Sequence, residues 1–230
     1  MICLTQYGRR EWFAATIMAA AVCALVTVAA TTVSGWFAVL LPLPVLLWLG
    51  VVWFFRDPER AAPRAPGLLL SPADGHVADI TEIGPDSPLG RNGVKIGIFM
   101  SVFDVHVNRS PAAVRVGHME HTRGAFLDVR DPQAPLRNES TTIHLTHQRD
   151  GEAWPLVVRQ IAGLIARRIV TDLAEGQDLS RGQRIGMIKF GSRLELMAPR
   201  ELAVRVPVQI GQRVRAGQSV LATTQEAGDG

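Results

Sequence analysis

Residues 12–55 read WFAATIMAAAVCALVTVAATTVSGWFAVLLPLPVLLWLGVVWFF, and none of these side chains is charged. The Ser34–Gly35 pair divides the stretch into two apolar blocks, residues 12–33 and 36–55. Each block has about 20 residues, the length at which an α-helix crosses about 30 Å of hydrocarbon. A signal peptide has a shorter apolar region, and no second block follows it directly. The sequence therefore predicts a transmembrane helical hairpin within residues 1–60, with helices at about 12–33 and 36–55.

The charges that flank the hairpin set its expected topology. The connecting turn is neutral, whereas both outer ends carry arginines: Arg9, Arg10, Arg56, Arg60 and Arg64. Because positively charged flanks tend to stay on the cytoplasmic side, both ends are expected there. The rest of the chain is then held at the cytoplasmic face of the cell (inner) membrane.

Two prolines in the second block leave an alternative open. Pro42 and Pro44 each lack an amide donor and weaken this block as a straight helix. A kinked or re-entrant hairpin in one leaflet is the alternative to two full crossings. Either form anchors the residues that follow.

Composition limits the chemistry. The formal net charge of +3 predicts only a mild attraction to an anionic surface, and we expect no nucleic-acid partner. Both cysteines, Cys3 and Cys23, lie in the N-terminal region, and Cys23 is inside the apolar run. This pattern argues against a disulfide framework and fits a reducing compartment. No zinc-type cysteine spacing is present, so no metal is expected.

Residues 61–230 have the pattern of a separate globular domain. It opens with a proline-rich linker at 61–67. Apolar and polar residues then alternate in short runs broken by turn signals, notably at 93–100, 140–147 and 193–197. Such alternation is typical of strands in a mainly antiparallel sheet. Residues 156–173 fit a strand followed by a helix but remain ambiguous.

A weak repeat refines the fold class. The stretch GQRI at 182–185 is echoed by GQRV at 211–214, which opens GQRVRAGQSVLA. Together with PADGHV at 72–77, this stretch resembles the paired hairpins of biotinyl/lipoyl-like barrel-sandwich folds. Ordinary glycine-cornered hairpins are the alternative. We expect an α+β fold, mainly antiparallel β with a barrel-sandwich core, after the helical hairpin.

Three polar stretches gather around turns. In LSPADG at 70–75, Asp74 is a candidate acid, although Asp–Gly also commonly shapes a turn. In FMSVFDVHVNRSP at 99–111, polar residues alternate and would share one side of an extended chain: Asp104, His106, Asn108 and Ser110. His106 is suited to moving protons near neutral pH, although a polar side can also be merely solvated.

The third stretch, KFGSRLEL at 189–196, places Gly191 before Ser192 at the start of a strand. If strained backbone presents the Gly191 carbonyl to the Ser192 hydroxyl, an N-to-O acyl shift gives an ester. Elimination of that ester and hydrolysis then leave a pyruvoyl group at position 192. Glycine suits the acyl side because it tolerates unusual dihedral angles.

Taken together, these stretches resemble the phosphatidylserine decarboxylase proenzyme family, and more closely its short bacterial and archaeal-type branch. The resemblance is carried by SPADG at 71, FMSVFDVHVNRSP at 99, RNE at 137 and GMIKFGSR at 186. They cover most of the soluble domain in the family's order and spacing. Each piece alone is weak, and the combination is specific.

The resemblance implies autocatalytic cleavage between Gly191 and Ser192. A β chain, residues 1–191, and an α chain, residues 192–230, would remain together as a heterodimer. Ser192 would become the covalent pyruvoyl cofactor and form a Schiff base with the substrate. The implied reaction converts phosphatidylserine in the bilayer to phosphatidylethanolamine and CO₂. Asp74 matches the acid that assists self-cleavage.

The chain departs from the longer relatives at the second histidine. Those relatives carry His-x-x-His, whereas this chain has His106-Val107-Asn108-Arg109. The self-cleavage histidine therefore falls on Arg109, and His106 matches the histidine linked to decarboxylation. The base for self-cleavage stays open, and the other candidates are His76, His118 and His121.

Substrate binding is assigned to three residues in the matching stretches: Asn108, Arg109 and Asn138. A non-enzymatic reading also exists, in which a membrane hairpin carries a lipoyl-like adaptor module that binds partner proteins. That reading accounts for the anchor and for residues 211–222. It does not account for the segments around His106 and Ser192.

Overall fold

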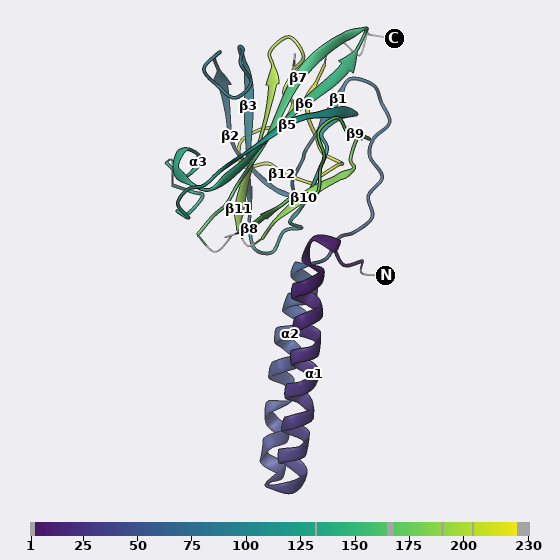
Figure 1. Cartoon of the computed structure of the whole chain (residues 1–230), viewed down its shortest axis with the longest axis vertical. Coiled ribbons are helices and arrows are strands. Elements are labelled where there is room, and N and C mark those ends of the chain that lie inside the picture. The colour runs from purple at the N-terminus through teal and green to yellow at the C-terminus, as the bar shows by residue number, and fades with distance from the viewer. Residues whose placement is uncertain (1–2, 132, 165–167, 190, 204, 225–230) are drawn as a thin grey trace. The chain divides into compact units, whose positions relative to one another are not determined.

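The computed structural model describes residues 3–131, 133–164, 168–189, 191–203 and 205–224. The chain divides into two compact units, Met1–Glu59 and Arg60–Gly230, and each is described by itself. Figure 1 shows helices in the first unit and mostly strands in the second. The sequence-based expectation of two apolar helices followed by a mainly antiparallel β region is confirmed.

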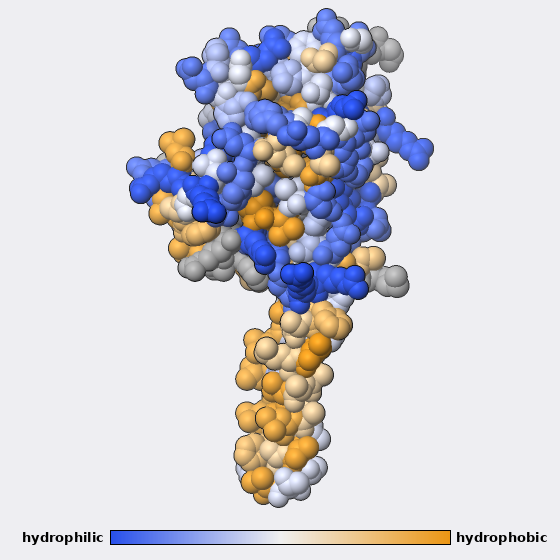
Figure 2. All heavy atoms as spheres, in the orientation of Figure 1, coloured by the Kyte–Doolittle hydropathy of each residue, from blue (hydrophilic) through white to orange (hydrophobic). Residues whose placement is uncertain are grey.

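The first unit is a pair of apolar helices. After a short 3₁₀ turn (η1, Gln6–Gly8), α1 spans Arg9–Thr32 and has a length of about 36 Å. A 3₁₀ segment (η2, Gly35–Leu40) then leads into α2, Pro42–Phe54. By length and composition the segments Gln6–Thr32 and Gly35–Phe54 could each cross a membrane. Their surface is apolar over most of its area, as Figure 2 shows.

The two prolines lie where a helix tolerates them. Pro42 is the first residue of α2, and Pro44 lies in the same first turn. Amides in this turn have no intrahelical acceptor, so a missing N–H costs little there. The irregularity predicted for this block is accommodated at Leu41, where the 3₁₀ segment meets α2.

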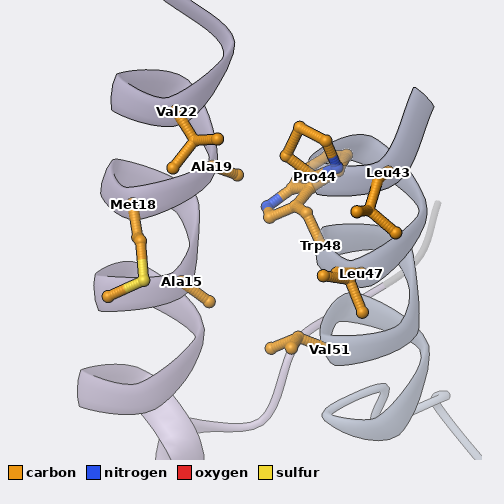
Figure 3. Close-up of a pocket in the computed structure, with 9 residues that line it drawn as sticks. All are labelled: Ala15, Met18, Ala19, Val22, Leu43, Pro44, Leu47, Trp48 and Val51. Atoms are coloured by element: carbon orange, nitrogen blue, oxygen red, sulfur yellow. The ribbon is translucent and has the colours of Figure 1, made fainter. Parts of the chain in front are cut away.

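The two helices leave a groove between them. Ala15 and Ala19 of α1 face Pro44 and Trp48 of α2, as Figure 3 shows. The groove has a volume of about 300 Å³ and an almost entirely apolar lining. Beside it, the Trp48 indole donates a hydrogen bond of 3.0 Å to the Thr16 hydroxyl. Such interhelical bonds satisfy polar groups where no water is present.

The second unit consists of thirteen strands and one short helix, α3 (Ala134–Arg137), among the residues described. The strands are β1 (Leu68–Leu70), β2 (Gly75–Ile83), β3 (Gly93–Met100), β4 (Val107–Arg109), β5 (Val114–Thr122), β6 (Ser140–Arg149), β7 (Glu152–Ile161), β8 (Arg168–Val170), β9 (Asp178–Leu179), β10 (Arg184–Lys189), β11 (Ser192–Pro199), β12 (Arg213–Val214) and β13 (Val220–Thr223).

These strands form three antiparallel sheets. The largest has the order β12-β2-β3-β11-β7-β6-β5-β9 and curls into a half-barrel. A three-stranded sheet has the order β4-β10-β8, and β1 pairs with β13. The main apolar core joins them, because Leu69, Ile185 and Leu221 of the small sheets pack with inward-facing residues of the large one.

The alternating runs are confirmed as strands. Residues 93–100 form β3, residues 140–147 belong to β6, and residues 193–197 belong to β11. The ambiguous stretch contains the end of β7 and then β8, with no helix among its described residues. Residues 165–167 lie outside the described part of the chain.

Candidate active site

The chain passes from one sheet to another twice at the same place. Residues 101–106 join β3 to β4, and residues 190–191 join β10 to β11. β3 pairs with β11 in the large sheet, whereas β4 pairs with β10 in the three-stranded sheet. The two crossings therefore bring the segments 99–111 and 189–196 together. Phe190 itself lies outside the described residues.

Gly191 occupies the second crossing in a backbone conformation that favours glycine. Its φ is +60°, in the left-handed region. Its carbonyl oxygen lies so close to the Gly163 backbone that a Cβ at Gly163 would overlap it. Two glycines thus meet backbone to backbone, one after β7 and one before β11. This approach fixes where the Gly191 carbonyl lies.

The fully buried His106 contacts the backbone of Gly191 from the first crossing. Its Nδ1 lies 3.0 Å from the Asp104 carbonyl oxygen, which can only accept, so Nδ1 carries the proton. Nε2 is then an acceptor and receives the Gly191 N–H at 3.4 Å. The Asp104 carboxylate shapes this turn by accepting from the Ser101 amide and hydroxyl at 2.9 and 2.8 Å.

The alternating polar run is only partly extended. Only Val107–Arg109 form a strand, and residues 101–106 turn, so Asp104 and His106 do not lie on one side of a strand with Asn108. Ser110 donates its hydroxyl to the Ala112 carbonyl at 2.7 Å. The requirement to cross between sheets breaks the strand here.

Ser192 is buried within a row of polar groups. It is the first residue of β11 and pairs with Met100. Its hydroxyl donates to the Met100 sulfur at 3.4 Å, and the Asn108 amide lies 3.9 Å from the same sulfur. The Asn108 oxygen accepts from the Gln160 amide at 2.8 Å. Because a thioether is a weak acceptor, the Ser192 hydroxyl is only weakly hydrogen-bonded.

Asp74 lies at the same end of the sheet but is engaged elsewhere. It precedes β2, and a Cβ at Gly75 would overlap the Phe99 carbonyl of β3. Its carboxylate forms a two-point ion pair with Arg60 and accepts the Ala216 N–H at 2.8 Å. Since β3 separates β2 from β11, no direct contact joins Asp74 to Ser192 in the described structure.

The side chains of Arg109 and Asn138 bind backbone. Arg109 is buried and donates to the Gly182 carbonyl at 3.1 Å. The Asn138 amide donates to the Leu127 and Ala162 carbonyls at 2.8 and 2.9 Å, and its oxygen accepts the Leu127 N–H at 2.8 Å. Asn138 therefore ties its loop to the residue beside Gly163. Their substrate-binding roles stay predictions.

The other candidate histidines lie on more distant strands. His76 is an exposed residue of β2, which β3 separates from β11. His118 and His121 belong to β5, which β6 and β7 separate from β11. His118 stacks on His144 with ring centroids 3.9 Å apart. Burial and then the neighbouring His118 lower the pKa of His144. Among described histidines, only His106 contacts Gly191.

Sequence reasoning missed three contributors to this site: Gln160, Gly163 and Met100. Each lies in an apolar run typical of a buried strand, where nothing marks it as functional. The one usable signal is a glutamine at 160 within the apolar β7, since a buried amide needs a partner. Its Nε2 finds Asn108, and its Oε1 is buried with no hydrogen-bond partner in the described structure.

Exposed apolar side chains border the crossings. Val102 and Phe103, in the turn before His106, are 38% and 75% exposed, and Leu164, after Gly163, is 60% exposed. If Gly191 had a Cβ, the nearest side chain to it would be that of Val102, at 3.9 Å. We call these three residues the apolar rim. No group of three potential metal ligands occurs among the described residues.

The arrangement is suited to breaking the peptide bond between residues 191 and 192. It combines a carbonyl fixed by a backbone contact, a weakly bonded hydroxyl on the next residue, and a neutral imidazole beside them. Imidazole can move protons at neutral pH. A nucleophile and a base from adjacent elements are the usual requirements of acyl transfer.

Comparison with known proteins places these features in a family. The family model for phosphatidylserine decarboxylase matches residues 49–222. The phosphatidylserine decarboxylase proenzyme of Syntrophus aciditrophicus is 43% identical over 189 residues, covering 82% of this chain and 85% of the relative. Proenzymes with the same description from Symbiobacterium thermophilum and Rhodopirellula baltica are 46% and 39% identical, covering 76% and 88% of this chain and 79% and 83% of theirs.

Asn138 generates a prediction about stability. Asn138→Ala removes three hydrogen bonds and leaves buried backbone groups unpaired, so we expect the free energy of unfolding to fall by about 2–4 kcal/mol. Urea unfolding in detergent measures it. Asn92→Ala, in an exposed turn, is the control. A loss below about 0.5 kcal/mol, the range of an ordinary surface substitution, would contradict the prediction.

Proposed function

The chain belongs to the phosphatidylserine decarboxylase family, and we propose that it decarboxylates phosphatidylserine to phosphatidylethanolamine after cutting its own backbone between Gly191 and Ser192. The geometry at the second crossing is the main support. There, the left-handed Gly191 directly precedes the buried Ser192, its carbonyl lies against Gly163, and its N–H donates to the imidazole of His106. The match over residues 49–222 leaves the adaptor reading without support.

Self-cleavage would start at the Ser192 oxygen. The hydroxyl oxygen bonds to the Gly191 carbonyl carbon, the hydroxyl proton moves to a base, and the C–N bond breaks as its nitrogen takes up a proton. The resulting ester loses the Gly191 carboxylate by elimination across Cα and Cβ of residue 192. Water then replaces the nitrogen of residue 192, ammonia leaves, and a pyruvoyl group remains.

His106 is the base that the geometry favours for this step. Its Nε2 is an acceptor next to the Gly191 amide, and its orientation is set by the Asp104 carbonyl. In the longer relatives a second histidine takes the self-cleavage role, and Arg109 occupies that position here. We therefore assign to His106 both proton transfer in cleavage and proton delivery during decarboxylation.

Asp74 is assigned an indirect part in self-cleavage. Its carboxylate is held between Arg60 and the Ala216 amide, which fixes it at the start of β2. Through Gly75 it packs against β3 at the Phe99 carbonyl, one residue from Met100. Loss of Asp74 would loosen the strand on which Ser192 is aligned.

The surroundings of residue 192 fit a pyruvoyl group. Ser192 is fully buried, its hydroxyl donates to the Met100 sulfur, and the Asn108 amide lies 3.9 Å from the same sulfur. A pyruvoyl group supplies an electron sink for loss of the substrate carboxylate. Asn108, oriented by Gln160, can donate a hydrogen bond to a carboxylate brought to this position. This supports its assignment to substrate binding.

Cleavage would give a β chain of residues 1–191 and an α chain of residues 192–230. Residues 204 and 225–230 of that α chain lie outside the described structure. Its strand β11 pairs with β3 and β7 of the β chain. Its strands β12 and β13 pair with β2 and β1 of the β chain, respectively. The α chain therefore stays bound as one half of a heterodimer.

The turns that flank β12 support the barrel-sandwich interpretation of the core. Gly211 and Gly217 have φ values of +86° and +70°, as glycine-cornered turns require. Between them β12 pairs with β2 in the large sheet, whereas β13 crosses to pair with β1. We assign residues 211–222 and 72–77 to paired hairpins of this type.

The two apolar helices support a place in the cell (inner) membrane. Their lengths suit a bilayer crossing, and the basic flanks favour both ends at the cytoplasmic face. The apolar rim supports lipid access to the site. Exposed apolar side chains beside a lipid-processing site favour contact with acyl chains or the bilayer surface.

Ser192 provides the test of the proposed function. Ser192→Ala removes the attacking oxygen, so the chain should run intact on a denaturing gel and show no decarboxylation of phosphatidylserine. The native chain should separate into residues 1–191 and 192–230. Ser87→Ala, in an exposed turn, is the matched control and should be cleaved normally. An uncut native chain with full activity would overturn the proposal.

His106 should be needed in both steps. In His106→Ala the Gly191 N–H loses its acceptor and the one described histidine that contacts Gly191 is gone, so cleavage in a time course should slow at least tenfold. The decarboxylation rate per cleaved chain should fall as well. His76→Ala is the control, because it removes a histidine that lies on another strand, β2. Wild-type rates of both steps in His106→Ala would remove it from the mechanism.

The apolar rim should matter only for lipid in bilayers. Phe103→Ser should lower the rate on vesicles containing phosphatidylserine several-fold, because insertion of the ring is lost. The rate on dispersed short-chain phosphatidylserine should be unchanged. Ile210→Ser is the control, because it also replaces an exposed apolar side chain by serine, at a position before the edge strand β12. Equal loss on both substrates would instead place Phe103 within the site.

A further inference from the structure

A buried cluster of charges lies directly behind Ser192. Asp79 of β2 pairs with Gly97 of β3, and Gly97 pairs in turn with Glu195 of β11. These residues form a row across three neighbouring strands. Arg193 lies two positions before Glu195, so its side chain projects from the same face of β11. Ser192, the residue before Arg193, projects from the opposite face of β11.

The Arg193 guanidinium bridges the two carboxylates of this row. Its Nη2 lies 2.5 Å from the Asp79 carboxylate and 2.9 Å from that of Glu195, and Nε lies 3.0 Å from Glu195. Lys95 of β3 completes the cluster at 3.9 and 3.6 Å from the same two carboxylates. The cluster thus contains two positive and two negative groups.

Gly97 is what makes the bridge possible. A Cβ at this position would overlap the Arg193 guanidinium and lie 2.6 Å from the Asp79 carboxylate oxygen. The guanidinium therefore lies flat over the middle strand, in the space that the missing side chain leaves. Any larger residue at 97 would separate Arg193 from Asp79.

Burial gives the cluster its strength. The Arg193 and Glu195 side chains are only 8% and 1% exposed, whereas Asp79 is 29% exposed. Charged pairs away from water are screened weakly, and removing one partner leaves an uncompensated buried charge. A comparable ion pair joins Glu82 of β2 to Arg200, the residue after β11. These side chains are 68% and 54% exposed, so the pair is expected to contribute little.

The position of the cluster matters once the backbone is cut. Under the proposed function residue 192 becomes a chain terminus, and termini fray unless they are tied down. Asp79 and Lys95 would belong to the β chain, and Arg193 and Glu195 to the α chain. The ion pairs then join the two chains at the first residue after the reactive group.

We infer that Arg193 is a positioning residue, whose bridge to Asp79 over Gly97 holds the new α-chain terminus in place after cleavage. We call this bridge the Arg193 latch. It rests on the proposed function and adds to it. The latch acts from the face of β11 opposite to Ser192, so it does not touch the reacting atoms.

Asp79→Asn tests the latch, because it removes one charge from a partly exposed position and keeps the side-chain shape. We expect normal cleavage at Gly191–Ser192, a kcat at least tenfold lower, and a KM for phosphatidylserine within twofold of the native value. The α chain should also be released at a lower urea concentration. Glu82→Gln removes the exposed β2 ion pair to the α chain and should leave cleavage, kcat, KM and α-chain release unchanged.

Arg193→Lys is the second variant. It retains the charge but has no planar fork to span two carboxylates, so it should show the same loss of kcat in a chain that still folds and is cleaved. Native kcat and native α-chain release in both variants would overturn the latch. A variant in which cleavage itself is blocked would also overturn the latch, since the latch acts after cleavage. An uncut native chain would instead overturn the proposed function, which keeps the two failures distinct.

Discussion

The close approach of two backbones, at Gly163 and Gly191, is the contact on which the candidate site depends. It exists because β7 and β11 are paired neighbours and because neither residue has a side chain to hold them apart. The contact fixes one carbonyl at the point where the chain leaves one sheet for another. A Cβ at position 163 would overlap the Gly191 carbonyl oxygen, whereas at position 191 the left-handed φ of +60° is what favours glycine.

The groups around this site are held by backbone carbonyls and by one another. His106 is oriented by the carbonyl of Asp104, Asn108 by Gln160, and Asp74 by Arg60. Such an arrangement keeps each group ready before any substrate arrives, which is how preorganised sites lower barriers. The candidate site also lies where two sheets meet, because the chain passes from one to the other at residues 101–106 and 190–191.

Much of this could be predicted from the sequence, and the reasons are specific. Alternating residues predicted β3, β6 and β11, and the charge-free run at 12–55 predicted two helices. The same logic failed at 101–106, where a local turn replaces an extended chain because the strand must change sheets. It also could not find Gln160 or Gly163, whose partners come from distant segments. The functional roles of Asp74, Arg109 and Asn138 remain predictions.

The pairing of β11, β12 and β13 with strands from earlier in the chain has a consequence for how such a protein can be made. The segment that contains these strands supplies β11 inside the large sheet, β12 at the edge of that sheet, and β13 in the two-stranded sheet. Each of them pairs with strands that come earlier in the chain. Alone it would have no core to fold around. Synthesis as one continuous polypeptide places each of these strands beside its neighbours while the chain is still whole, which a separately made segment of residues 192–230 would lack.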